Sequence, residues 1–309
     1  MRGDAGTDVF ADLGKSGLRV QVHHGTSLRT RTGDGISPTQ RGDLGEILGR
    51  GISALLAQEQ TVRVDRVVIG STSELTAHET ASLFRVLRPS VPAAVIAVTD
   101  DGTLAHARRL NAPGVLLSVG TGVIAIARSG TGAFRRFDGW GPLSGDRGSA
   151  VDVGRRALRS AYRAVDAGIG TPLRDAVAAR IGPLGLDTAR GVLADERWPA
   201  LLAGIAEDVC SAADAGDDDA ARILDDAVEE LVGTARMAAE AAGVPEIVVT
   251  GRFGTSPAVA ARLMPAVRAI GLRPVDPHGD TAVSAREIVV GPYADLLAVD
   301  HPADSGVAP

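Results

Sequence analysis

The sequence has very little cysteine and few aromatic residues. Of its 309 residues, one is cysteine and 3% are Phe, Trp or Tyr. The lone thiol of Cys210 can form neither an internal disulfide nor a multi-cysteine metal cluster, and its helical surroundings favour a small core residue. Because aromatic side chains are scarce, the cores must be built from Val, Leu, Ile and Ala.

An excess of basic residues and a long apolar run are also lacking. The chain has 32 Lys and Arg against 38 Asp and Glu, a net charge of -6, without the basic clusters that phosphate backbones require. Its longest apolar run, residues 114–127, is short and interrupted by Gly, Ser and Thr. The N-terminal residues carry charges where a signal peptide is apolar. We therefore expect a cytoplasmic protein with no nucleic-acid or membrane partner.

What the sequence has is apolar periodicity, in two successive groups. Alternation predicts a hairpin of strands at 8–13 and 18–23 around the turn GKSG, followed by a helix at 44–56, a strand at 67–70, a helix at 75–87 and a strand at 93–98. The second group has strands at 114–118, 123–127 and 133–137, a mainly helical stretch at 152–243, a strand at 247–250 and a helix from 257. We predict two α/β domains, residues 1–112 and 113–298, and a tail at 299–309.

Several short motifs look like known nucleotide or nucleophile loops. GKS at 14–16 lacks the glycine that a Walker loop needs at position 9, where Val9 stands, and it lies in a hairpin; PLSG at 142–145 misses the nucleophile-elbow spacing. Three glycine turns next to strands are better candidates: DAGT at 4–7, GTG at 120–122 and GRFG at 251–254. Turns of this kind can direct backbone N–H groups at a phosphate.

These turns occur in a familiar order. DAGT, the acidic pair Asp100 and Asp101, VGTG, the segment GWGPLSGDRGS at 139–149 and VVTGRFG resemble, in order and spacing, the N-acetylglucosamine kinase group of the BadF/BadG/BcrA/BcrD-type ATPase family. The resemblance runs from about Gly3 to Leu297. It implies the actin-like ATPase fold of sugar kinases, with two ribonuclease-H-like domains and an interdomain cleft. Because three residues precede Asp4, we expect the family's first strand to be missing or very short.

The resemblance also implies site residues. It makes Asp4, Gly6 and Thr7 the first phosphate hairpin, with Asp4 near Mg²⁺, and Gly120, Thr121 and Gly122 the second. Gly251 and Gly254 would let the adenosine of ATP approach the backbone. Asp100 corresponds to the catalytic base that binds the sugar hydroxyl, with Asp101 as the neighbouring alternative. Gly139, Trp140, Gly141 and Asp146 would form the sugar site, Trp140 as an apolar wall and Asp146 as an acceptor for hydroxyls.

The reaction implied is transfer of the γ-phosphate of ATP to a hydroxyl of an amino sugar, such as N-acetylglucosamine, or a related hexose. A carboxylate can take the proton of the attacking hydroxyl while Mg²⁺ and the glycine hairpins offset charge. A homodimer is implied as well. Two alternatives stay open: a sugar or nucleotide sensor with weakened catalysis, and an activator-type ATPase of the same family, for which one cysteine is a poor supply of iron–sulfur ligands.

Overall fold

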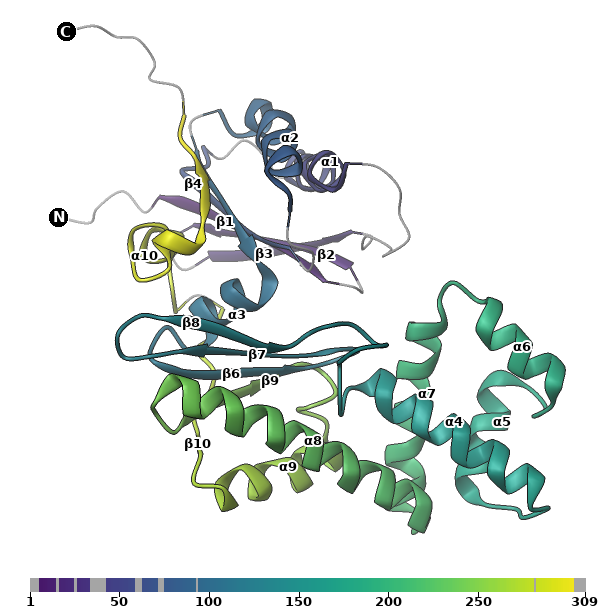
Figure 1. Cartoon of the computed structure of the whole chain (residues 1–309). Coiled ribbons are helices and arrows are strands. Elements are labelled where there is room, and N and C mark those ends of the chain that lie inside the picture. The colour runs from purple at the N-terminus through teal and green to yellow at the C-terminus, as the bar shows by residue number, and fades with distance from the viewer. Residues whose placement is uncertain are drawn as a thin grey trace, which may run out of the picture. The chain divides into compact units, whose positions relative to one another are not determined.

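The chain folds into two compact units in the computed structural model (Figure 1). The structure describes residues 6–14, 17–24, 27–33, 43–58, 63–71, 75–92, 94–280 and 282–302. Unit 1 comprises the described residues of 1–111 and of 278–309, and unit 2 comprises residues 112–277.

Unit 1 is built on a mixed sheet whose central strands are parallel. The strand β1 (Thr7–Gly14) pairs antiparallel with β2 (Gly17–His24), and β2 pairs with β3 (Ser27–Gly33). On its other side β1 pairs parallel with β4 (Arg66–Ser71), and β4 with β5 (Val95–Asp100). The short strand β11 (Ala298–Asp300) pairs with β5 and lies at one edge of the sheet, whose order is β11-β5-β4-β1-β2-β3.

Alternation along these strands divides their side chains between two faces. Val9, Ala11 and Leu13 join the apolar core under α1 (Leu44–Leu56) and α2 (Ala77–Leu87). The opposite face carries Asp8 and Phe10 and is covered by α3 (Asp101–Arg109) and α10 (Ala285–Val290). The remaining short elements of unit 1 are η1 (Arg88–Ser90) and η2 (Ala294–Leu296).

Unit 2 repeats the strand order of unit 1. Its meander consists of β6 (Gly114–Val119), β7 (Val123–Arg128) and β8 (Phe134–Asp138), all antiparallel. The first strand of this meander pairs parallel with β9 (Glu246–Thr250), which pairs with β10 (Arg273–Pro274). In both sheets the third, second, first, fourth and fifth strands of the unit lie in that order, which is the ribonuclease-H-like arrangement.

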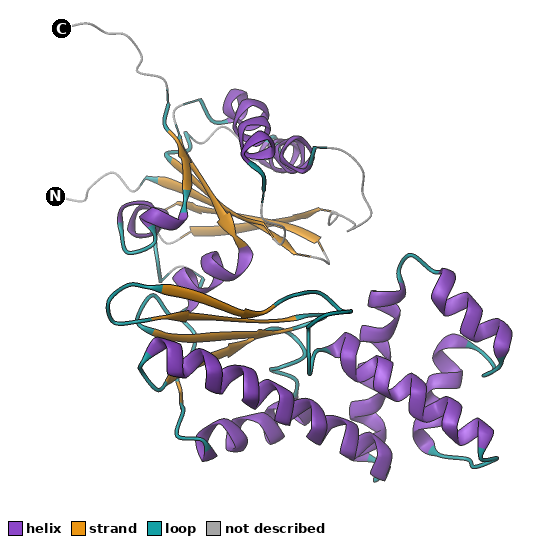
Figure 2. Ribbon diagram, viewed as in Figure 1, coloured by secondary structure: helices purple, strands orange, loops and turns teal. Residues whose placement is uncertain are grey.

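Helices make up the rest of unit 2 (Figure 2). The long helix α8 (Asp218–Ala242) lies along one face of the sheet beside α9 (Pro257–Ala269). The other four helices form a bundle next to the sheet: α4 (Ala150–Asp166), α5 (Pro172–Ile181), α6 (Leu186–Ala194) and α7 (Trp198–Asp214). Alanine and branched aliphatic residues fill the core that these helices share with the sheet.

The expected α/β class is confirmed, and two expectations differ from the structure in detail. The first strand of unit 1 is present as β1, because the chain becomes extended at Thr7, after DAGT. Residues 278–302, which we placed with the second domain and the tail, pack in unit 1, where β11 pairs with β5. Within the described residues, the structure has no helix with the length and apolar character needed to cross a membrane.

Candidate functional site

The carboxyl ends of the three parallel strands define one edge of the unit 1 sheet. Asp12 of β1 pairs with Gly70 of β4, Leu13 with Ser71, and Ser71 with Asp100 of β5. Loops at the carboxyl ends of parallel strands are where ligands bind in open α/β sheets. Asp12 and the predicted base Asp100 therefore belong to the same edge.

The predicted first phosphate hairpin lies elsewhere. Thr7 is the first residue of β1, five residues before Asp12, which at about 3.3 Å per residue separates them by about 17 Å along the strand. Its backbone N–H donates to Oδ2 of Asp65 at 2.7 Å, and its hydroxyl lies 3.0 Å from Nδ1 of His24. Gly6 lies beside the same Asp65 carboxylate, and Asp4 is outside the described residues.

This position corrects the sequence expectation. Gly6 and Thr7 lie at the amino end of β1, whereas the pairing of β1 with β2 closes at the other end of the strand, at Gly14 and Gly17. The hairpin adjoins the edge that holds Asp100, whereas Thr7 lies at the opposite end of β1. Gly14 and Gly17, the first and last residues of the segment GKSG that does not fit a Walker loop, thus lie at the edge of interest. Lys15 and Ser16 are outside the described residues.

Asp12 and Arg19 flank this hairpin. They are paired residues of β1 and β2, with Nη2 of Arg19 3.3 Å from Oδ2 of Asp12. About 39% of the Asp12 side chain is exposed, so the carboxylate remains open to a ligand. A half-exposed carboxylate at a strand end has the hard oxygen donors that Mg²⁺ prefers.

Asp100 and Asp101 stand at the junction of β5 and α3. Asp100 is the N-cap of α3, and its Oδ1 accepts a hydrogen bond from the backbone N–H of Thr103 at 2.9 Å. Oδ2 has no partner among the described residues. Asp101 is the first residue of the helix and is half-buried. The cap fixes the Asp100 carboxylate while leaving one oxygen for a hydroxyl.

In unit 2, the structure brings the predicted glycine turns together. Gly120, Thr121 and Gly122 form the turn between β6 and β7, closed by a hydrogen bond from the Gly120 N–H to the Gly122 carbonyl at 2.8 Å. Gly254, in the turn after β9, donates its N–H to the carbonyl of Val119 at 2.9 Å. Ser118 and Thr250 are register partners, so both turns follow parallel strands at one edge.

Close backbone approach explains the glycine at one of these positions. Gly251 has φ +87, and a Cβ there would lie 2.3 Å from the carbonyl oxygen of Val119. The other turn is different. Gly120 has open space where a Cβ would stand, and the backbone N–H groups of Thr121 and Gly122 take no acceptor among the described residues. Free N–H groups in a glycine turn are a ready anion site.

The segment 139–149 is tied to this turn through two buried aspartates. Asp146, 2% exposed, accepts the backbone N–H of Val123 through Oδ1 at 3.0 Å. Oδ1 of Asp138 accepts the N–H of Asp146 at 2.7 Å, and its Oδ2 accepts the N–H of Arg147 at 3.3 Å. Both aspartates have positive φ, +58 at Asp138 and +55 at Asp146. The sequence did not indicate Asp138. Asp146, predicted as an acceptor for sugar hydroxyls, supports the hairpin of β6 and β7 through its hydrogen bond with Val123.

The remaining predicted sugar residues lie in the same loop. Trp140 is 73% exposed, and Gly139 and Gly141 on either side have φ of +72 and +84. The loop leads into α4, whose first backbone N–H, from Ala150, donates to the Gly120 carbonyl at 3.0 Å. The edge of unit 2 thus combines a glycine turn, a helix start and an exposed indole.

Near the start of α4, Asp152 fixes the loop further. It accepts the N–H of Gly148 at 3.2 Å and pairs with Arg155 and Arg156. Burial by itself raises the pKa of this carboxyl. The hydrogen bonds from Arg155 and Gly148, together with the two arginine charges, outweigh burial and lower the pKa.

Two ribonuclease-H-like units, each with a β-hairpin and a strand-end loop at the carboxyl edge of its sheet, define the actin-like ATPase class of fold. Within this class, the chain belongs to the BadF/BadG/BcrA/BcrD ATPase family, whose profile matches residues 29–282.

Solved structures share the fold over most of the chain. A candidate N-acetylglucosamine kinase from Chromobacterium violaceum is 24% identical, with a TM-score of 0.70 over 90% of this chain and 96% of that one. A second, from Porphyromonas gingivalis, is 16% identical, with a TM-score of 0.71 over 87% and 94%. A ROK family glucokinase from Streptomyces griseus, in complex with glucose and AMPPNP, has 15% identity and a TM-score of 0.55 over 85% and 89%.

A curated relative matches over a shorter stretch. The N-acetylmuramic acid/N-acetylglucosamine kinase of Clostridium acetobutylicum is 35% identical over 72 residues, which is 23% of this chain. The match spans about a quarter of that relative, 24% of its length.

Proposed function

We propose that this protein is an ATP-dependent kinase that transfers the γ-phosphate of ATP to a hydroxyl of an amino sugar, such as N-acetylglucosamine, or a related hexose. The observation that carries the proposal is the convergence in unit 2 of the turn 120–122, the turn 251–254 and the loop 139–149 on the carboxyl edge of one sheet. The kinases named among the relatives and structural neighbours support the choice of reaction and of sugar class.

In unit 2, the proposal assigns the free N–H groups of Thr121 and Gly122 to a phosphate of ATP. Gly251 and Gly254 allow the adenosine to lie against the backbone. Trp140 provides a flat apolar surface for a sugar ring, since an exposed indole on a fixed loop loses little conformational freedom on binding. Asp146 is a positioning residue for the turn.

In unit 1, the proposal assigns the other phosphate contact to the β1–β2 hairpin, in place of Gly6 and Thr7. The repeated topology supports this, because β1 and β2 correspond in sheet order to β6 and β7, whose turn is 120–122. Asp12, at the same edge, would hold Mg²⁺. Bound there, the ion would offset negative charge on the phosphates of ATP.

Asp100 is the proposed general base. Its Oδ1 is fixed by the helix cap, and its Oδ2 is available to accept the proton of the attacking hydroxyl. Asp101, one residue on, is the alternative. Mutation separates the two, because Asn is itself a good N-cap and Asp100→Asn retains the cap acceptor. We expect the variant of the true base to bind ATP and lose turnover, and the variant of its neighbour to retain most of it.

The decisive measurement is ADP release in the presence of ATP, Mg²⁺ and each of a panel of hexoses, hexosamines and N-acetylhexosamines, with mass analysis of the sugar. A sugar-dependent rate and a phosphorylated sugar are expected. Nucleotide binding without turnover on any sugar would instead identify a sensor. Sugar-independent hydrolysis would identify an activator-type ATPase, although burial raises the pKa of the Cys210 thiol and so disfavours the thiolate that a cluster needs.

A matched pair of glycine variants tests the phosphate turn. Gly120 and Gly130 both have open space at Cβ and neither has positive φ, so alanine fits at both. We expect Gly120→Ala to weaken ATP binding at least about ten-fold, because the methyl group lies where a phosphate would approach the backbone. Gly130→Ala is the control and should bind ATP as the wild type does. Equal ATP affinity in the two variants would contradict the assignment of an ATP phosphate to this turn.

A further inference from the structure

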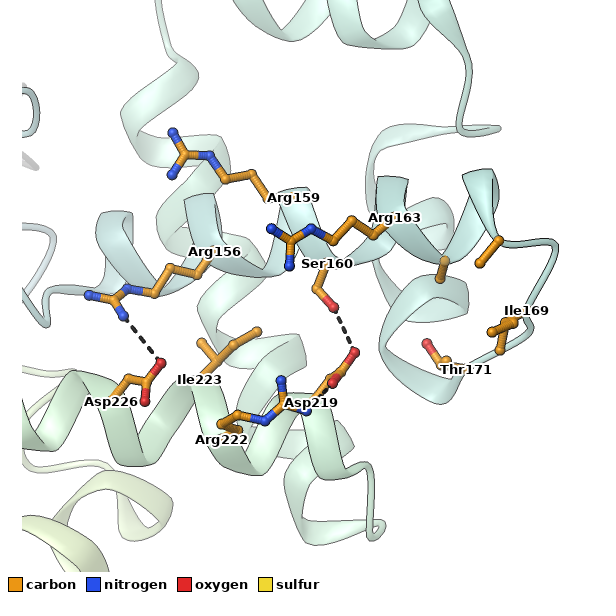
Figure 3. A pocket seen from close by; sticks show the side chains of 12 residues that line it. Arg156, Arg159, Ser160, Arg163, Ile169, Thr171, Asp219, Arg222, Ile223 and Asp226 are labelled. Atoms are coloured by element: carbon orange, nitrogen blue, oxygen red, sulfur yellow. Dashed lines mark hydrogen bonds and ion pairs between the residues drawn. The ribbon is translucent and has the colours of Figure 1, made fainter.

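A separate arginine-rich pocket lies between α4 and the beginning of α8 in unit 2 (Figure 3). Its volume is about 460 Å³, within the range of small-molecule sites. The walls carry four arginines and two aspartates: Arg156, Arg159, Arg163, Arg222, Asp219 and Asp226. Arg163 lies 13 residues after the first residue of α4, so it is about 20 Å along the helix from the site at residues 120–149.

Both aspartates of the pocket already have partners. Asp219 accepts a hydrogen bond from the Ser160 hydroxyl at 2.9 Å and pairs with Arg222, and Asp226 pairs with Arg156 at 3.4 Å. Figure 3 shows the contacts of Ser160 with Asp219 and of Arg156 with Asp226 as dashed lines. Arg156 is further held by Asp152. The acidic groups are therefore used to fix two of the four arginines.

The side chains of Arg159 and Arg163 are left without a hydrogen bond or ion pair among the described residues. They are four residues apart on α4, so they project from the same face of the helix, and both are exposed. The hydrogen bonds from Ser160 and Arg222 lower the pKa of Asp219 most, and the charge of Arg163 lowers it to a smaller extent. Four arginines against two aspartates leave a charge of +2 on this wall.

The rest of the pocket lining indicates a ligand that has an apolar part as well as an anionic group. Ala164 and Ile223, 9% and 8% exposed, form an apolar surface beside the arginines, and Ile169 and Thr171 of the α4–α5 loop extend it. Guanidinium groups bind phosphate oxygens in a bidentate manner. We propose that this pocket binds a small organic phosphate monoester, with the phosphate on Arg159 and Arg163 and the organic part against the apolar surface.

The test is calorimetric binding of glucose 6-phosphate to the full chain. Arg159→Gln with Arg163→Gln should weaken binding at least about ten-fold, because both charge-assisted hydrogen bonds to the phosphate are lost. The control is Arg236→Gln with Arg268→Gln, which removes the same charge at exposed positions on α8 and α9 and should retain wild-type affinity. Inorganic phosphate should bind to the wild type more weakly than the ester does. The two double variants should have the same affinity for neutral glucose.

Three outcomes would overturn the proposal: wild-type affinity in the Arg159/Arg163 variant, an equal loss in the control, or inorganic phosphate binding as tightly as the ester. The readout is binding, so it does not depend on kinase activity. A protein that binds the ester through these arginines and phosphorylates no sugar would uphold this inference while contradicting the proposed function.

Discussion

Removing the Asp138 carboxylate should destabilise unit 2 more than removing an exposed carboxylate does, because Asp138 is one of the two buried aspartates that tie the loop 139–149 to the sheet. It is 1% exposed and accepts the backbone N–H groups of Asp146 and Arg147. In Asp138→Ala the buried N–H of Asp146 loses its acceptor, at a cost of about 1–3 kcal/mol. A left-handed φ of +58 without the local hydrogen bonding of an aspartate adds about 1 kcal/mol.

The expected loss is therefore about 2–4 kcal/mol, which corresponds to a fall in Tm of about 5–10 °C for a unit of this size. Both tryptophans of the chain, Trp140 and Trp198, lie in unit 2, so thermal unfolding followed by tryptophan fluorescence reports on that unit. Asp138→Asn keeps an acceptor for Asp146 and should recover more than half of the loss. Asp225→Ala, which removes an acid that is 67% exposed, is the control and should shift Tm by less than about 2 °C.

A Tm for Asp138→Ala within 2 °C of the wild type would refute the reasoning, because it would mean that the two N–H groups find water or another acceptor at no cost. A fall in Asp138→Asn as large as in Asp138→Ala would also count against it. That result would assign the effect to the loss of charge beside Arg147, whose Nε lies 3.7 Å from the carboxylate.

Three further predictions concern the same edge. Gly251→Ala should destabilise unit 2 by at least about 2 kcal/mol, measured by chemical unfolding, since positive φ and the Val119 carbonyl both oppose a Cβ, whereas Gly130→Ala should be neutral. Asp152 has a lowered pKa, so its contribution to stability is present above its ordinary value of 3.8 and is lost as the pH falls further. Asp152→Asn should therefore be less stable than the wild type at pH 7, and the difference should shrink below about pH 4; a constant difference would contradict this. Trp140→Ala should leave Tm unchanged, because the side chain is 73% exposed. The variant should bind the sugar more weakly and ATP as the wild type does. An unchanged sugar affinity would show that the indole is not part of the sugar site.

Local sequence signals located most of the strands and helices, because alternation and helical spacing are properties of short segments. They also located the loops of unit 2, whose turns 120–122 and 251–254 immediately follow apolar strands. They did not reveal β3, because Ser27–Gly33 is an exposed edge strand of polar residues with no apolar alternation. Nor did they show that residues 278–302 return to unit 1, since pairing between β11 and β5 joins segments about two hundred residues apart.

The sequence analysis also did not predict the arginine-rich pocket between α4 and α8, for a related reason. Arg156, Arg159 and Arg163 are three and four residues apart, so they are dispersed in the sequence and gather only on one face of α4. The overall charge of -6 conceals them. Asp226, which pairs with Arg156, comes from α8, 70 residues later, so no local pattern could show which of the arginines on α4 remain unpaired.

The displaced phosphate hairpin shows why a glycine motif needs its strand. DAGT at 4–7 has the right residue types, but a phosphate loop of this kind follows the central strand, so that its backbone N–H groups lie at the edge that holds the proposed base Asp100. The apolar residues of that strand, Val9, Ala11 and Leu13, follow DAGT instead of preceding it. The segment GKSG follows them, and the strand order shared by both units supports the proposal that the hairpin of β1 and β2 corresponds to that of β6 and β7. The order of strand and turn along the chain, which the sequence displays, therefore locates the hairpin better than the glycine pattern does.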